Sequence, residues 1–155
     1  MRDIKDIVIH CSATPDGDDR FDRAAIDRMH KERGWSMIGY HFVIEIDGKI
    51  VDGRPLERIG AHVQGSNAKS IGICMIGTKM YTLAQWVALG GLVGRLHADY
   101  PGARIQGHRD FSPDLDGDGI IERNEWVKDC PNFDVIPWFA GGMQPIAAQT
   151  IDNHE

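Results

Sequence analysis

Asp6-Ile-Val-Ile-His-Cys11 is a short, largely apolar run that stops at polar Ser12 and the turn-prone Pro15-Asp16-Gly17. A run of this length that is rich in Ile and Val is typical of a strand buried in a sheet. The strand leaves His10 near its carboxyl end, where a functional side chain can be held rigidly. The rest of the fold can be worked out from this strand.

The remaining pattern alternates predicted helices with predicted strands. A helix is expected over residues 22–33, where Ile26, Met29 and His30 follow a helical spacing until Gly34. A second helix is expected to start after Thr82, a favourable N-cap residue, and to end at residues 100–102, Tyr-Pro-Gly. Further strands are predicted at residues 41–46, 49–52, 70–77 and 104–107, the first two joined by the hairpin turn Asp47-Gly48.

Length and composition exclude several classes of protein. The chain has 155 residues, enough for one domain with a sizeable core and too few for two ordinary domains. With 42% hydrophobic and 26% charged residues it suits a soluble globular protein. The formal charge of -6 leaves no excess of cations for nucleic-acid phosphates. No segment approaches the ~20 apolar residues of a membrane span, and residues 1–6 lack a secretion signal's apolar core. We therefore expect a cytoplasmic protein with no nucleic-acid partner and no stable membrane association.

Three residues suit a metal site. Residues 104–107 place His108 at a strand end, much as the first strand places His10. Zinc hydrolases use three His, Cys or carboxylate ligands on rigid elements and keep one position open for water. His10, His108 and Cys130 fit that requirement, although spacing alone also allows each of them to be incidental.

The other cysteines and histidines receive structural interpretations. Three cysteines are an odd number at wide spacing, which makes a poor disulfide framework. Cys11 is assigned to the core because alternation along the strand points it away from His10, and Cys74 is assigned there with it. The remaining histidines without a ligand partner are interpreted as structural or exposed: His30, His41, His97 and His154.

Several motifs occur together in a recognisable order. They are His10-Cys-Ser-Ala-Thr14, His30-Lys-Glu-Arg-Gly-Trp35, Gly39-Tyr-His-Phe-Val-Ile44, Gly60-Ala-His62, Ser70-Ile-Gly72, Gly107-His-Arg109 and Lys128-Asp-Cys-Pro131. In this order they resemble the type-2 N-acetylmuramoyl-L-alanine amidases, in particular the small phage lysozyme-type endolysins. The resemblance runs from about Ile7 to Trp138, nearly the whole chain.

The resemblance implies a fold, a reaction and a set of site residues. The fold is α/β, a single domain with a central mixed sheet of about five or six strands flanked by helices, as in amidases and peptidoglycan-recognition proteins. The family's zinc ligands fall on His10, His108 and Cys130. Its catalytic residues fall on Tyr40 and Lys128, and His62 matches a further histidine near the substrate groove. The reaction implied is hydrolysis of the amide joining the lactyl group of N-acetylmuramic acid to the L-alanine of the stem peptide.

An acidic loop departs from the family pattern. Residues 114–125 fit the twelve-residue calcium loop Asp-x-Asp-x-Asp-Gly-x5-Glu at every specified position. Its predicted calcium ligands are Asp114, Asp116, Asp118, the Ile120 carbonyl and Glu125, with Glu122 as a further candidate. A solvated Asp/Gly turn is the alternative, because Pro113 argues against a regular incoming helix. We expect a bound calcium ion to order the segment that carries Lys128 and Cys130.

These observations predict a zinc-dependent phage endolysin. The catalytic domain is expected at residues 1–139, with the loop 114–125 inserted, and residues 140–155 as a frayed tail. The protein is expected to be a monomer that waits in a host cytoplasm and then acts on the periplasmic peptidoglycan. Two alternatives remain: a cytoplasmic amidase that recycles anhydromuropeptides, and a peptidoglycan-recognition module without catalysis.

Overall fold

The computed structural model describes residues 2–112, 115, 117, 121 and 129–151. Five strands form one mixed sheet in the order β3-β2-β4-β1-β6. Their bounds are β1 (Asp6–Cys11), β2 (Phe42–Ile44), β3 (Ile50–Asp52), β4 (Ser70–Met75) and β6 (Arg104–Gly107). The predicted α/β domain with a central mixed sheet is confirmed.

The first strand occupies an interior position of this sheet. β1 pairs in parallel with β4 on one side and with β6 on the other, and β2 pairs in parallel with β4. The hairpin of β2 and β3 supplies the antiparallel pair, and its turn residue Gly48 has a φ of 87°, which favours glycine. Every residue of β1 and β4 is buried, as expected for parallel strands covered on both faces.

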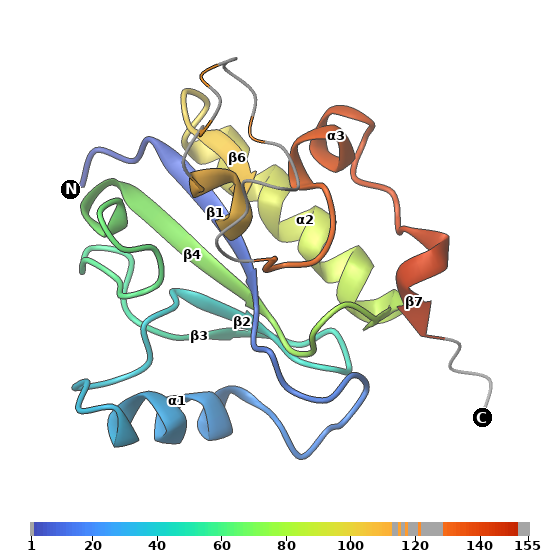
Figure 1. The fold of residues 1–155 in the computed structure, drawn as a ribbon, viewed down its shortest axis with the longest axis horizontal. Coiled ribbons are helices and arrows are strands. Elements are labelled where there is room, and N and C mark those ends of the chain that lie inside the picture. The colour runs from blue at the N-terminus through green and yellow to red at the C-terminus, as the bar shows by residue number, and fades with distance from the viewer. Residues whose placement is uncertain (1, 113–114, 116, 118–120, 122–128, 152–155) are drawn as a thin grey trace.

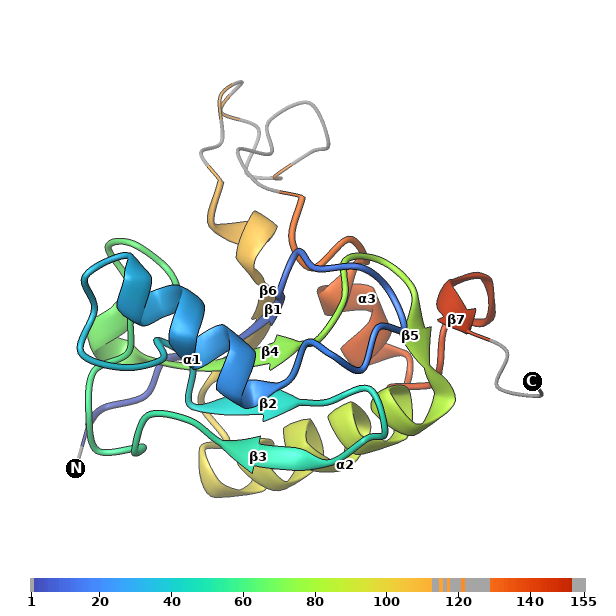
Figure 2. The ribbon, with the colours of Figure 1, turned by 90° about the horizontal axis from the view of Figure 1, so that it is seen from below.

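Two helices cover opposite faces of the sheet, as Figures 1 and 2 show. Helix α1 (Arg23–Glu32) is capped by the Asp22 side chain, which accepts the Ala25 N–H. Helix α2 (Leu83–Asp99) begins at a capping box, in which Thr82 accepts the Gln85 N–H and Gln85 accepts the Thr82 N–H. Both helices start where the sequence predicted.

Alternation along β1 divides its side chains between two cores. Ile7, Ile9 and Cys11 belong to the larger core, together with the buried side chains of α2. The smaller core contains Ile26 of α1 and Cys74 of β4. Because side chains alternate, His10 points to the face opposite Cys11, which is the face that α1 covers.

The carboxyl-terminal segment corrects one expectation. Helix α3 (Val135–Ala140) is followed by β7 (Thr150–Ile151), which pairs in parallel with β5 (Tyr81–Thr82). The Trp86 indole N–H also donates to the Gln149 carbonyl at 3.3 Å. The prediction of a frayed tail from residue 140 was therefore wrong for residues 140–151, since a two-residue strand leaves no periodic signal. Short 3-10 turns complete the fold: η1 (Asn67–Lys69), η2 (His108–Phe111) and η4 (Ala147–Gln149).

The helices of the described part of the chain include none that is both long and apolar enough to cross a membrane.

Candidate metal centre

Three predicted ligands meet beside the carboxyl ends of two neighbouring strands. Parallel pairing sets Ile9 opposite Gly107, so His10 and His108 leave β1 and β6 side by side, with ring centroids 4.7 Å apart. Cys130 joins them from the segment before α3, and the ligand atoms of the three residues all lie within 4.8 Å of one another. The geometry therefore forms a candidate site for a metal ion.

Cys130 is held by the strand that carries His10. The backbone N–H of Cys11 donates to the Cys130 Sγ at 3.0 Å. A hydrogen bond to the Cys11 thiol and burial raise the pKa of the Cys130 thiol, so a nearby cation is needed to hold it as a thiolate. Cys11 is buried in the larger core as predicted, whereas its contact with Cys130 has no signal in the sequence.

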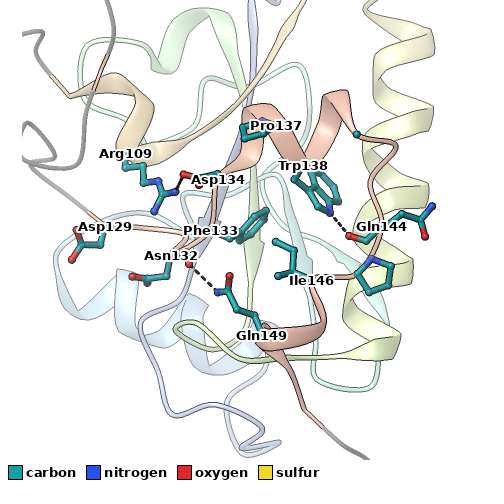
Figure 3. A pocket seen from close by; sticks show the side chains of 12 residues that line it. Arg109, Asp129, Asn132, Phe133, Asp134, Pro137, Trp138, Gln144, Ile146 and Gln149 are labelled. Atoms are coloured by element: carbon teal, nitrogen blue, oxygen red, sulfur yellow. Dashed lines mark hydrogen bonds and ion pairs between the residues drawn. The ribbon is translucent and has the colours of Figure 1, made fainter.

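The chain that follows Cys130 is fixed by contacts from distant elements. The Arg109 N–H donates to the Cys130 carbonyl at 2.9 Å, and the Asn132 side chain donates to the Thr78 carbonyl at 2.7 Å. A cavity of about 850 Å³ lies beside this segment, and Figure 3 shows the side chains that line it. At its edge Arg109 forms an ion pair with Asp134. These contacts position the Cys130 ligand from outside the candidate metal centre.

His62 contacts a predicted ligand directly. Its Nδ1 lies 2.9 Å from His10 Nε2, and its Nε2 lies 3.2 Å from the Ser70 hydroxyl. Gly72 of β4 permits this approach, because a Cβ there would lie 2.6 Å from His62 Cγ. His62 was predicted near the substrate groove. It lines the cavity around the three candidate ligands, which is separate from the cavity of Figure 3, and its hydrogen bonds connect Ser70 to His10.

The charge states of these groups suit a metal centre. Burial, followed by the neighbouring His62 and His108, lowers the pKa of His10 well below its ordinary value. Burial and then His41 lower the pKa of His62 to about 3. Burial raises the pKa of the Tyr40 phenol well above its ordinary value, so Tyr40 remains a hydrogen-bond donor at neutral pH. The Tyr40 ring lies 5.1 Å from that of His10, centroid to centroid.

A cavity of about 690 Å³ surrounds the candidate centre. Its lining brings together all predicted zinc, catalytic and substrate residues that the structure describes: His10, Tyr40, His62, His108 and Cys130. The lining also contains three residues of the motif at residues 30–35 for which the sequence predicted no part in the site: His30, Arg33 and Trp35. Lys128 and the calcium ligands Asp114, Asp116, Asp118, Ile120, Glu122 and Glu125 lie outside the described residues.

Comparison with known proteins identifies the family. The family described as N-acetylmuramoyl-L-alanine amidase matches residues 1–132. The chain belongs to this family. Membership confirms the predicted enzyme class, so the protein is an N-acetylmuramoyl-L-alanine amidase.

The relatives of this amidase include phage and animal proteins. The endolysin of Enterobacteria phage K11 is 36% identical over 142 residues, which cover 86% of this chain and 84% of that protein. Among solved structures, the amidase LysC from Clostridium intestinale URNW is 30% identical with a TM-score of 0.68, covering 86% of this chain and 80% of that one. Drosophila PGRP-LB is 25% identical with a TM-score of 0.68, covering 90% of this chain and 81% of that one. The similarity to these structures supports the fold assignment.

Proposed function

We propose that this amidase is a phage or prophage endolysin that uses zinc to hydrolyse the amide between N-acetylmuramic acid and L-alanine in peptidoglycan. The convergence of His10, His108 and Cys130 within 4.8 Å is the observation that carries the proposal. The similarity to the endolysin of phage K11 supports the lytic role. The enzyme would accordingly act on the peptidoglycan of a host in whose cytoplasm it is made.

The chemistry of the donor set fits zinc. Two imidazoles and one thiolate are ligands that zinc accepts, and three protein ligands leave a fourth position for water or substrate. The lowered pKa of His10 keeps its imidazole neutral and able to coordinate. The Cys11 N–H at 3.0 Å from the Cys130 Sγ favours the thiolate form of that ligand. Two neutral ligands and one anionic ligand would leave a net positive charge on the site.

The side chains of the cavity have separate tasks in this proposal. A bound zinc ion would supply an activated water and polarise the scissile carbonyl. Tyr40 is a protonated donor beside His10, so its hydroxyl can donate a hydrogen bond to the oxygen on which negative charge develops, or carry a proton to the departing amine. Lys128 is proposed, from the family resemblance, as the second catalytic group.

His62 is proposed as the residue that orients His10. With His10 Nε2 bonded to His62 Nδ1, the other ring nitrogen of His10 is left for the metal. The Ser70 hydroxyl at the far side of His62 holds that ring in turn. Such outer contacts set ring orientation and raise ligand affinity in metal sites.

The test is digestion of purified sacculi with the zinc-loaded protein and with a Cys130→Ser variant, followed by mass spectrometry of the released material. Stem peptides that carry a free L-alanine amine, released by the wild type alone, are the expected result. Cleaved glycan strands with intact stems would mean a glycosidase and would overturn the proposal. Binding without release would favour the recognition module, and cleavage confined to soluble muropeptides would favour a recycling amidase.

A further inference from the structure

Two cysteines are in contact in the lining of the cavity around the candidate metal centre. The Cys11 N–H donates to the Cys130 Sγ at 3.0 Å, and that sulfur lies 3.8 Å from the Cys11 carbonyl oxygen. The two thiols are also hydrogen-bonded to each other. Cys130 therefore contacts both the backbone and the side chain of Cys11, although 119 positions separate them in the sequence.

The elements that carry the two cysteines hold them together. Cys11 is the last residue of β1, which pairs with a strand on each side. The Asn132 side chain, two positions after Cys130, donates to the Cys11 Sγ at 3.8 Å and to the Thr78 carbonyl at 2.7 Å. Thiols that the fold already keeps in contact can bond covalently with little movement of the backbone.

The proposed reaction uses only one of these thiols. All three cysteines of the chain are free, and Cys130 alone is a candidate metal ligand. Cys74 belongs to the smaller core and is absent from the described lining of the cavity. Cys11 and Cys130 both line it, so a small oxidant that enters the cavity can reach either sulfur. A cysteine with a second thiol beside it is the usual arrangement for reversible oxidation.

We propose that Cys11 and Cys130 form an intramolecular disulfide when the protein meets hydrogen peroxide, and that this modification removes a ligand from the candidate metal centre. First, one sulfur attacks the peroxide, an S–O bond forms as the O–O bond breaks, and water leaves with the thiol proton. The second thiol then attacks the resulting sulfenic acid, an S–S bond forms, and a second water leaves. The two thiols lose two electrons, and the peroxide accepts them.

The disulfide and the metal ion exclude each other. Coordination needs the thiolate form of cysteine, which a disulfide sulfur cannot supply. The oxidised protein would retain His10 and His108, two ligands where catalytic zinc sites use three. Conversely, zinc bound to the Cys130 sulfur would slow its oxidation. The loss of zinc rests on the proposed function, whereas formation of the disulfide does not.

The test is treatment of the zinc-loaded protein with hydrogen peroxide, followed by blocking of free thiols and mass spectrometry of proteolytic peptides. We expect a pair of peptides joined through Cys11 and Cys130. Zinc, measured with a chromophoric chelator, should be released in step with this pair, and dithiothreitol should restore zinc binding. Complete release of zinc without the joined peptides would overturn the proposal.

Cys11→Ala tests the role of the second thiol. It retains the three candidate ligands and also the residue 11 N–H that donates to Cys130. Without a neighbouring thiol, excess peroxide should oxidise Cys130 to sulfinic acid, which dithiothreitol does not reverse, so zinc binding should be lost permanently. Cys74→Ala is the matched control, a buried cysteine outside the cavity lining, and should recover as the wild type does. Equal recovery in Cys11→Ala and the wild type would contradict the proposal.

Peptide mapping separates this proposal from the proposed function, because it does not depend on amidase activity. If sacculi are not cut, the proposed function fails, yet peptides joined through Cys11 and Cys130 still support the modification site. If sacculi are cut and peroxide-treated protein yields no such peptides, the modification site alone is rejected.

Discussion

Gly72→Ala should weaken metal binding without removing any ligand. An added Cβ would lie 2.6 Å from His62 Cγ, whereas ordinary contacts begin near 3.4 Å, so the ring must move by at least the difference of 0.8 Å. The hydrogen bond from His62 to His10 is 2.9 Å long, and a shift of that size along it would break it. Loss of an outer contact of this kind lowers metal affinity about 10- to 100-fold.

The assay is competition for zinc between the protein and a chromophoric chelator, with thermal unfolding measured in parallel. Gly91→Ala is the matched control, because a Cβ on this glycine of α2 meets no atom within 4 Å and zinc affinity should not change. His62→Ala should weaken zinc binding to a similar extent, and adding Gly72→Ala to it should bring little further loss. Wild-type zinc affinity in a folded Gly72→Ala protein would refute the reasoning.

Three further predictions concern catalysis, pH and calcium. Tyr40→Phe should lower kcat by about 100-fold or more, because it removes a hydrogen-bond donor. Zinc content should stay unchanged, since the three candidate ligands remain in place. A kcat within twofold of wild type would exclude Tyr40 from the chemistry. Burial lowers the pKa of His41 from 6.5 to about 4 in the folded protein, where its Nδ1 accepts the Gly72 N–H. Between these two pH values the unfolded chain therefore binds more protons than the folded chain. The melting temperature should therefore fall as pH drops from 6.5 toward 4, and His41→Gln should flatten this dependence; identical pH profiles would contradict the assignment. Excess calcium should raise the melting temperature relative to EGTA if residues 114–125 bind the ion, and equal values in the two conditions would count against a calcium site.

The sequence was a reliable guide wherever a signal was local. The six residues of β1, the Thr82 cap and the Asp47-Gly48 turn each carry their own pattern, and each element forms at the expected place. The candidate metal ligands followed from motifs, and the structure brings them together because a histidine at the end of a buried parallel strand has little freedom of position. The tail was misjudged because β7 is stabilised by its partner β5 rather than by its own two residues.

The sequence by itself determined the family, the α/β class and the residue types that a metal-dependent amidase needs. Tertiary structure decided which residues are in contact. His62 contacts His10, which is 52 positions away in the sequence, and the Cys11 N–H donates to Cys130, which is 119 positions away. The physical reason is that such contacts arise from the register of neighbouring strands and from the missing side chain of Gly72, which lets a ring lie against the sheet. The same packing brings Arg33 and Trp35, at the end of α1, to the cavity around the candidate metal centre.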